Sequence, residues 1–327
     1  MSVAFVFPGQ GSQSVGMLAA LAELHPVVRE TFEAASGALG FDLWALVQNG
    51  PAEALALTEN TQPVMLVAGV ATWRVWCLAE GPRPEWVAGH SLGEFTALVA
   101  AGVLSFEDAV RLVRFRGEVM RDAVPDGQGG MAAVLGLSDA DVEAACAEAA
   151  AGEVVEAVNF NAPQQVVIAG HAAALKRAIE AAKARGAKRA LPLPISVPCH
   201  SSLMQGAARQ LRDRLQAVTL SAPTLRFMSS VDAEEYREPA SIADLLYRQL
   251  ASPVRWVRTV EALRERGVRQ FVECGPGKVL AGLVKRIDRS GEISCYALED
   301  QQSIESARTT LQGGADASGS EPSGSKP

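Results

Sequence analysis

One short motif restricts the fold of this chain more than any other feature. Residues 89–93, G-H-S-L-G, match the G-x-S-x-G pattern, in which a serine stands on a sharp turn between a buried strand and a helix. The flanking residues suit such a turn, because 85–88 are mostly apolar and 94–101 have the composition of a helix. Small residues also surround serine in ordinary turns, so the motif alone leaves that alternative open. As an elbow, it predicts an α/β fold that presents the hydroxyl of Ser91 as a nucleophile.

Composition indicates a globular protein. The chain has 327 residues, 48% of them hydrophobic and 20% charged, which is enough for one or two domains. No apolar run approaches the roughly 20 residues that span a bilayer, and the first residues lack the basic region and cleavage site of a signal peptide. We therefore expect a cytoplasmic protein. The five cysteines are scattered and never in C-x-x-C spacing, so the sequence indicates neither a disulfide framework nor a metal site.

The charge of the chain argues against one class of partner. A formal net charge of -7 disfavours nucleic-acid binding, which depends on cations that neutralise phosphates. One segment nevertheless gathers six cations: Lys176, Arg177, Lys183, Arg185, Lys188 and Arg189. They form either a solvated helix face or a surface that attracts an acidic partner.

The first part of the chain has the pattern of a parallel sheet flanked by helices. The uninterrupted apolar run 3–7 predicts a strand buried on both faces. Helical patterns alternate with short apolar runs; they lie at 17–24, 26–38, 61–79, 94–101 and 106–122. This alternation predicts an open, mostly parallel sheet of the α/β class.

A second unit is predicted from residue 127 onward. Its elements follow the order β-α-β-β-α-β: strand 131–137, helix 139–150, strands 154–159 and 165–169, helix 172–185 and strand 188–195. That order is the ferredoxin-like arrangement. We therefore predict a catalytic domain of residues 1–126 and 196–300, an inserted ferredoxin-like subdomain of residues 127–195, and a flexible C-terminal tail over 301–327, whose glycine- and serine-rich end has little to bury.

A serine nucleophile needs a base, and the chain has four histidines. His200 is the best candidate, because it stands where the chain re-enters the larger domain and at the predicted start of a helix. A helix N-terminus disfavours the protonated imidazole and so keeps the ring available as a base. A histidine that merely caps or packs is the alternative. The neighbouring Cys199 is a weaker candidate for a nucleophile, since nothing around it suggests activation.

Acyl transfer also needs donors for the oxyanion. In an elbow the backbone N–H of Leu92, directly after the nucleophile, is one such donor, and a loop after an early strand provides the second. The loop at residues 9–11 is placed for that role. Its rival interpretation is a dinucleotide fingerprint, which is disfavoured because Ser14 occupies the place of the third glycine.

Arg116 gives the only indication of a substrate. It falls on the apolar face of the helix predicted at 106–122 and therefore points inward. A buried guanidinium needs an anion. The residues alone leave two anions open: an internal carboxylate, or the carboxylate of a bound substrate.

With these residues assembled, the sequence resembles the malonyl-CoA:acyl carrier protein transacylases, the acyltransferases of fatty acid and polyketide synthesis. The resemblance covers about residues 3–297 and implies the fold of that family, an α/β-hydrolase-like core with a ferredoxin-like insert. It rests on a set of motifs: FPGQGSQ at 7–13, TQP at 61–63, GHSLGE at 89–94, RFRGEVM at 114–120, NFNAPQQVVIAG at 159–170, VPCHSSLM at 197–204, QLASPVRW at 249–256 and GPGKVL at 275–280. Phe95, Cys199 and Ser201 stand at positions where members of the family differ.

The resemblance implies a role for each matching residue. Ser91 is implied as the nucleophile and His200 as its base, in a dyad that has no orienting carboxylate. Gln249 matches the residue whose backbone carbonyl orients the histidine instead. Gln10 and Leu92 match the two residues whose N–H groups form the oxyanion hole.

The implied activity is a two-step transfer of a malonyl group from malonyl-CoA to the phosphopantetheine thiol of an acyl carrier protein, in fatty acid or polyketide biosynthesis. Arg116 matches the arginine that binds the malonyl carboxylate. No metal or other cofactor is implied, because CoA and phosphopantetheine belong to the substrates. We expect the segment from Lys176 to Arg189 to dock the carrier protein. The alternatives are a serine hydrolase or thioesterase and a non-catalytic carrier-docking subunit, and malonyl and methylmalonyl donors are not distinguished.

Overall fold

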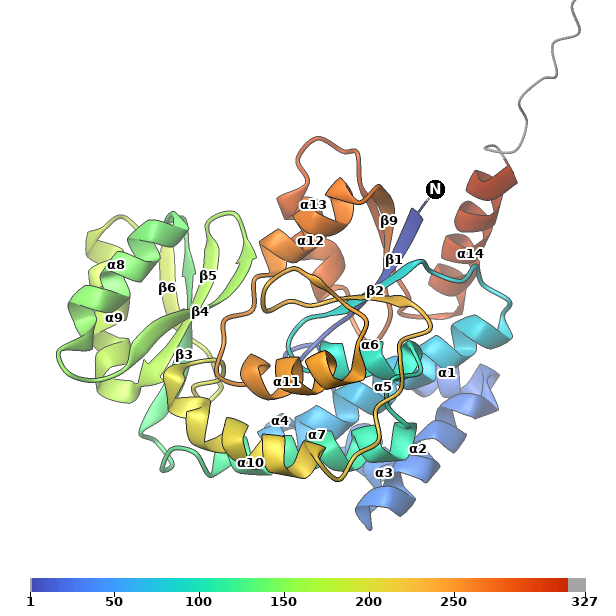
Figure 1. The fold of residues 1–327 in the computed structure, drawn as a ribbon, viewed down its shortest axis with the longest axis horizontal. Helices are drawn as coiled ribbons and strands as arrows, with labels where there is room; N and C mark the ends of the chain where they lie inside the picture. Colours follow the sequence, from blue (N-terminus) through green and yellow to red (C-terminus); the bar gives the residue numbers. More distant parts are fainter. Residues whose placement is uncertain (1, 317–327) are drawn as a thin grey trace, which may run out of the picture.

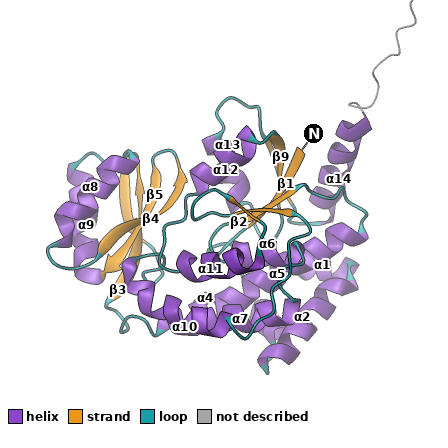
Figure 2. Cartoon of the chain, in the orientation of Figure 1, coloured by secondary structure: helices purple, strands orange, loops and turns teal. Residues whose placement is uncertain are grey.

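The computed structural model describes residues 2–316, which form a mixed α/β fold with two sheets (Figure 1, Figure 2). The strands of the larger sheet are β1 (Ser2–Phe7), β2 (Trp86–Gly89), β7 (Arg226–Met228), β8 (Glu235–Tyr236), β9 (Val268–Glu273) and β10 (Ser294–Ala297). Their order across the sheet is β10-β9-β1-β2-β7-β8. All neighbours pair in parallel except β7 and β8. The predicted parallel sheet is therefore present, with β2 at an inner position.

Helices cover both faces of this sheet. The side chains of β1 therefore alternate between two hydrophobic cores, one on each face. Val3, Phe5 and Phe7 join one core and Ala4 and Val6 the other. The first core receives residues from α1 (Ala19–Leu24), α2 (Pro26–Leu39), α3 (Leu43–Asn49), α4 (Ala52–Ala56), α5 (Thr58–Leu78), α6 (Gly93–Ala100), α7 (Phe106–Arg121), α10 (Gln205–Leu215) and α11 (Pro239–Gln249). The second core receives residues from α12 (Trp256–Glu265) and α13 (Val279–Ile287). The doubly covered sheet explains the uninterrupted apolar run of β1.

The smaller sheet lies at one end of the molecule, with its two helices outermost (Figure 1). Its elements are β3 (Gly129–Leu135), α8 (Asp139–Ala150), β4 (Val155–Ala162), β5 (Gln165–His171), α9 (Ala172–Ala184) and β6 (Arg189–Pro192), in antiparallel order β4-β5-β3-β6. Val166 and Ile168 pack with α8 and α9, whereas Val167 and Ala169 belong to the core of the larger unit. One face of the small sheet therefore lies against the rest of the molecule.

The prediction of a flexible tail over residues 301–327 is wrong for its first part. Residues Gln301–Asp316 form helix α14, which packs beside β10. Three apolar residues on one face of this helix are buried: Ile304, Ala307 and Leu311. Asp300 caps the helix, since its Oδ1 accepts from the N–H of Ser303 at 2.8 Å. The rest of the predicted tail, residues 317–327, lies outside the described residues.

The structure also describes helix length, possible metal-binding groups and the state of the cysteines. Across residues 2–316, no helix is both long and apolar enough to cross a lipid bilayer. In the same span, no group of three or more His, Cys, Asp or Glu side chains is arranged to hold a metal ion. All five cysteines lie within it, each as a free thiol.

Candidate active site

The serine elbow connects β2 directly to α6. Ser91 lies between them with a left-handed backbone, φ 54°, as the G-x-S-x-G pattern predicts. The two glycines of the motif are required by close backbone packing. A Cβ at Gly89 would collide with the backbone of Gly93 and Glu94, and a Cβ at Gly93 would collide with the carbonyl of Phe7. The elbow thus brings the nucleophile to the carboxyl end of an inner strand, where open α/β sheets bind their ligands.

Ser91 and His200 lie together although 109 positions separate them in the sequence. The Oγ of Ser91 is 2.6 Å from the Nε2 of His200. The Nδ1 of the same ring is 2.9 Å from the carbonyl oxygen of Gln249 and 3.1 Å from that of Ser252. Carbonyls only accept hydrogen bonds, so Nδ1 carries the proton and Nε2 is free to accept one from the serine. The backbone of Ser252 is a second orienting group that the sequence did not predict.

The reason for the neutral state of His200 differs from the one that the sequence suggested. Helix α10 begins only at Gln205, after a short 3₁₀ turn at Ser202–Met204, and His200 itself has a left-handed φ of 65°. The ring is 3% exposed. Burial, and after it the positive charge of Arg116, lowers the pKa of His200 to about 3. Desolvation, and not a helix N-terminus, keeps this imidazole unprotonated.

The other histidines are engaged elsewhere. Each bonds a different partner: His25 Nε2 lies 2.6 Å from Gln301 Oε1, His90 Nε2 lies 2.7 Å from Asn161 Oδ1, and His171 Nδ1 accepts from the N–H of Val154 at 3.0 Å. His90 therefore connects the elbow to the small sheet instead of reaching the serine beside it. Among the four, the structure brings only His200 to Ser91.

Arg116 is completely buried and has no ionic partner. Its Nη1 donates to Gln62 Oε1 at 2.6 Å and its Nη2 to Gln249 Oε1 at 3.0 Å, while its Nε donates to no acceptor among the described residues. No Asp or Glu oxygen in the described chain lies within 4.0 Å of the guanidinium. The Nη2 is 3.5 Å from the Oγ of Ser91. Burial lowers the pKa of Arg116 to about 10, so it stays charged at neutral pH.

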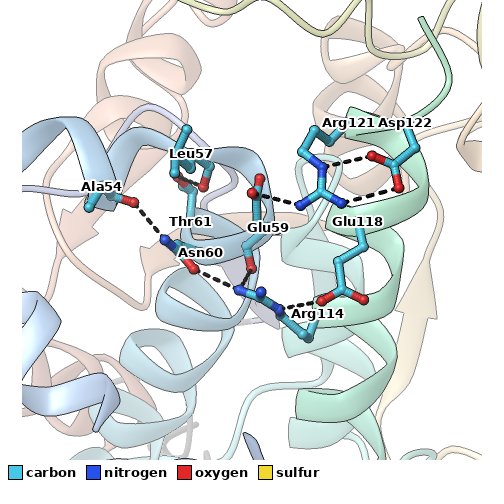
Figure 3. Close-up of polar contacts among 9 residues, drawn as sticks. All are labelled: Ala54, Leu57, Glu59, Asn60, Thr61, Arg114, Glu118, Arg121 and Asp122. Carbon is cyan, nitrogen blue, oxygen red and sulfur yellow. Dashed lines mark hydrogen bonds and ion pairs between the residues drawn. The ribbon is translucent and has the colours of Figure 1, made fainter. Parts of the chain in front are cut away.

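A polar network fixes the helix that carries this arginine. Arg114 Nη1 donates to the carbonyl of Glu59 at 3.0 Å and to Asn60 Oδ1 at 2.6 Å, and Arg121 Nη1 donates to Glu59 Oε1 at 2.9 Å (Figure 3). These bonds join α7 to the first turn of α5. The same turn of α5 continues into Gln62, so the network sets the register between the two helices that meet at the buried guanidinium.

Two side chains of the site were missed from the sequence. Gln62 accepts from Arg116, and Glu94 accepts from the side chain of Gln249, whose Nε2 also donates to the carbonyl of Ser91 at 2.9 Å. The sequence contains a feature that could have identified each of these two residues. Gln62 is a polar residue in a mostly apolar helix, and Glu94 is the last residue of the GHSLGE motif. Gln249 was predicted for its backbone alone, but its side-chain amide also forms hydrogen bonds with Arg116, with Glu94 and with the carbonyl of Ser91.

A cavity of about 430 Å³ opens at the dyad. One wall belongs to the larger unit and includes Gln10, Gln62, Ser91, Met120 and His200. The opposite wall belongs to the small sheet and the strand that leaves it, and it includes Met131, Asn159, Asn161, Val167 and Leu193. The cavity thus lies between the two sheets, and a size of several hundred cubic ångströms suits a small-molecule substrate.

Of the two predicted oxyanion donors, one lines the cavity and the other directly follows the nucleophile in the chain. Gln10 lines the cavity, and its side chain is held by the hydroxyl of Thr58 at 3.0 Å. Leu92 follows Ser91 at the start of α6. Among the described residues, neither backbone N–H donates to a protein acceptor. Their role as an oxyanion hole stays a prediction.

Two further residues near Arg116, Cys199 and Phe95, carry no charge. Cys199 is buried, and burial raises the pKa of its thiol to about 11, so it is protonated and does not act as a nucleophile. The ring of Phe95 lies 5.7 Å from the Cζ of Arg116. Its aromatic face contributes a cation–π contact to a guanidinium that has no carboxylate beside it.

The chain is similar to known proteins of one family. The model of the acyl transferase domain family matches residues 4–313. The malonyl CoA-acyl carrier protein transacylase of Salmonella typhimurium is 55% identical over 94% of this chain and 98% of its own, and that of Bacillus subtilis is 44% identical over 95% and 97%. Two solved structures superimpose with TM-scores of 0.93. One is the malonyl CoA-acyl carrier protein transacylase of Coxiella burnetii, 48% identical over 95% of this chain and 98% of its own. The other is a malonyl-transacylase in complex with its type II PKS acyl-carrier protein, 50% identical over 95% and 100%.

Proposed function

The chain belongs to the acyl transferase family, and from that premise we propose that it transfers a malonyl group from malonyl-CoA to the phosphopantetheine thiol of an acyl carrier protein in fatty acid biosynthesis. The relatives that carry the transacylase name share most of their length with this chain. The transfer runs through a malonyl ester on Ser91.

One observation carries this proposal: a buried arginine without a carboxylate lies beside a serine that already has its base. The Nη2 of Arg116 is 3.5 Å from the Ser91 Oγ, and the His200 Nε2 is 2.6 Å from the same atom. A buried guanidinium with an unpaired Nε is unfavourable unless an anion reaches it. An acyl group attached to Ser91 that ends in a carboxylate is such an anion, and a malonyl group is short enough to reach.

In the first half-reaction, His200 Nε2 takes the proton of Ser91 Oγ, which attacks the thioester carbonyl of malonyl-CoA. The N–H groups of Gln10 and Leu92 stabilise the oxyanion of the tetrahedral intermediate. The intermediate collapses with loss of the CoA thiolate, which receives the proton from His200. Arg116 holds the malonyl carboxylate throughout and so orients the acyl group.

In the second half-reaction the same groups act in reverse. His200 takes the proton of the phosphopantetheine thiol, the sulfur attacks the malonyl ester, and Ser91 leaves with the proton returned by His200. Backbone carbonyls of Gln249 and Ser252 hold the ring for both directions. Both steps use protein side chains and the two substrates, so we propose no additional cofactor.

Intact-mass analysis after incubation with a panel of acyl-CoA donors tests the proposal. The wild type should gain one malonyl group, and Ser91→Ala should gain none. Malonyl still bound covalently to Ser91→Ala would show that the nucleophile is another residue. Transfer to a thiol acceptor, with slow release to water, separates the transacylase from a thioesterase of the same elbow type, which would hydrolyse the ester. A wild type that accepts no acyl group from any donor would favour a non-catalytic docking subunit.

The fold that we assign to this function is an α/β-hydrolase-like core of residues 1–126 and 196–300 with a ferredoxin-like subdomain of residues 127–195. The elbow after the inner strand β2 supports the first assignment. The order β4-β5-β3-β6, with α8 and α9 on one face and a separate apolar core, supports the second.

The carrier protein is proposed to dock near the basic segment, at its β6 end. Arg177, Lys183 and Arg185 are each paired with a glutamate of the small unit, which weakens their attraction for a partner. Lys188 and Arg189 are exposed and, within the described chain, form no ion pair. Lys188 directly precedes β6 and Arg189 is its first residue. The strand leads into the cavity wall at Leu193, roughly 13 Å beyond Arg189 at strand spacing.

Charge reversal tests this docking site. Lys188→Glu should raise the KM for an acidic carrier protein, with the largest effect at low salt. Lys183→Glu, on the outer helix α9, is the matched control and should have little effect. Equal carrier kinetics for both variants across salt concentrations would place the docking site elsewhere.

A polyketide pathway is a second candidate for the carrier. A structural relative at 50% identity is a malonyl-transacylase in complex with its type II PKS acyl-carrier protein. Both pathways use the same chemistry at Ser91. Measuring kcat/KM with carrier proteins of both kinds, from the same organism as this chain, would distinguish them.

A further inference from the structure

A buried carboxylate that the proposed mechanism does not use lies one side chain away from Arg116. Glu94 is 0% exposed. Its Oε1 accepts from the N–H and the hydroxyl of Ser230, and its Oε2 accepts from the Nε2 of Gln249. At the other end of that amide, the Oε1 of Gln249 accepts from Arg116 Nη2 at 3.0 Å. A single amide therefore separates a buried anion from a buried cation.

The partners of Gln249 allow its amide only one orientation. An ionised carboxylate only accepts hydrogen bonds, and a guanidinium only donates them. The amide must therefore turn its NH₂ toward Glu94 and its oxygen toward Arg116. The carbonyl of Ser91, which accepts from the same NH₂, requires the same orientation.

The side chain at position 94 must accept on both of its oxygens. One oxygen faces the two donors of Ser230, and the other faces Gln249. A glutamine at this position would turn its own NH₂ toward one of these donors. That mismatch would disturb either the loop at Ser230 or the amide that contacts Arg116.

The separation between Glu94 and Arg116 determines which guanidinium donors stay free. Burial raises the pKa of Glu94 to about 7, and the hydrogen bonds from Ser230 and Gln249 oppose that rise and favour the carboxylate. In its ionised form, Glu94 favours the charged form of Arg116 against the effect of burial. A carboxylate in direct contact would occupy guanidinium donors, as the glutamates beside Arg114 and Arg121 do. One intervening amide lets the anion act on the guanidinium and leaves its Nε and the Ser91 side of Nη2 without a carboxylate.

Building on the proposed function, we propose that Glu94 is a positioning residue for Arg116. Through the amide of Gln249 it holds the guanidinium in place and balances its charge, while the remaining donors stay available to the carboxylate of the acyl group. Glu94 thereby determines part of the preference for acyl groups with a free carboxylate, without touching the substrate.

The test compares rates of Ser91 acylation by malonyl-CoA and by acetyl-CoA. Glu94→Gln should lower the malonyl rate about 10- to 100-fold, the effect of an unsatisfied buried hydrogen-bonding group. The acetyl rate should change about threefold at most, because an acetyl group has no carboxylate for Arg116 and general loss of stability affects both donors alike. The ratio of the two rates is the readout, since a merely structural role would not change it.

A double exchange, Glu94→Gln with Gln249→Glu, tests whether the place of the negative charge matters or only its presence. The new amide at 94 can donate to the new carboxylate at 249, which accepts from Arg116, and the backbone carbonyl at 249 still orients His200. The exchange keeps the net charge and puts the carboxylate directly on the guanidinium, but it removes the hydrogen bond that the side chain at 249 donates to the Ser91 carbonyl. That loss affects both acyl donors alike, so the readout is again the malonyl-to-acetyl ratio, which we expect to stay as low as in Glu94→Gln. Recovery of that ratio to the wild-type value would overturn the proposal.

Glu273→Gln is the matched control. Glu273 is equally buried and accepts from the N–H groups of Leu280 and Ala281, at 3.0 and 2.7 Å, far from Arg116 in the hydrogen-bond network. Its malonyl-to-acetyl ratio should equal that of the wild type. An unchanged ratio in Glu94→Gln overturns the inference alone, whereas a wild type that takes no malonyl overturns the proposed function. If Glu94→Gln does not fold, the double exchange decides.

Discussion

Helix α7 carries arginines in two different environments. Arg114 and Arg121 lie at its partly exposed face, and each has a carboxylate within 3 Å: Glu118 for the first, Glu59 for the second. Arg116, between them in the sequence, is fully buried, and all its hydrogen-bond partners among residues 2–316 are neutral: the amides of Gln62 and Gln249, the sulfur of Met120 and the hydroxyl of Ser91. The exposed arginines are paired, and the buried one is not.

If stability alone decided, the buried arginine would be paired with a carboxylate before the exposed ones. Burial makes a charge costly, so an internal carboxylate would be expected at Arg116 before it is expected at the surface. The molecule instead places neutral amides around Arg116, and the side chain of Gln249 lies between Arg116 and Glu94. This contrast underlies our proposal that Arg116 binds the substrate, whereas the paired arginines of Figure 3 join α7 to α5.

The largest effect is expected from the unpaired arginine. Arg116→Ala should lower the rate of malonyl loading about 100- to 1,000-fold, the loss that follows removal of one partner of a buried charge pair. Acetyl loading should change far less, because that donor has no carboxylate. The measurement is the rate of Ser91 acylation by each donor under identical conditions. An equal loss for both donors would make Arg116 a structural residue like its neighbours.

A smaller effect of another kind is expected from a paired arginine. Arg114→Ala removes two hydrogen bonds between α7 and the start of α5 and one ion pair within α7, and it should lower the free energy of unfolding by about 1–2 kcal/mol. Urea unfolding measures this loss. The malonyl-to-acetyl ratio should stay within about twofold of the wild type, because the variant leaves Arg116 in place. A marked fall in that ratio would show that the network of Figure 3 sets substrate choice as well as register.

The smallest effect concerns the response of the base to pH. His200 has its pKa lowered to about 3, first by burial and then by Arg116. A lowered pKa keeps the neutral form when the pH falls, so kcat/KM for acetyl-CoA should stay flat between about pH 8 and pH 5. An unperturbed histidine would lose about 30-fold by pH 5. An inflection near pH 6.5 in the wild type would contradict the buried state of the ring. In Arg116→Ala the inflection should move upward, since one cause of the low pKa is gone.

The sequence was most informative where chemistry requires particular residue types at particular places. The strand, serine and helix of the elbow follow from the glycines and the apolar run, and the structure brings Ser91 to His200. The inward direction of Arg116 followed from helix periodicity, and its complete burial agrees. The choice between an internal anion and a substrate could not be made from one helix, because the partners come from α5 and α11.

The errors have physical causes too. The tail prediction gave weight to the glycine- and serine-rich end and overlooked the spacing of Ile304, Ala307 and Leu311, which is that of an amphipathic helix. The low pKa of His200 was assigned to a helix N-terminus, although the helix starts five residues later and burial is the main cause. Burial depends on all the elements that close around a residue, which a local pattern does not report.

Both members of the dyad have left-handed backbones, φ 54° at Ser91 and φ 65° at His200. A second substituent on the β-carbon fits poorly in that conformation. Laboratory evolution of this centre should therefore accept an exchange of oxygen for sulfur at position 91 more readily than an exchange of serine for threonine, which would force the peptide to rotate. The shape of the main chain, before any question of reactivity, narrows the nucleophiles that this scaffold can adopt.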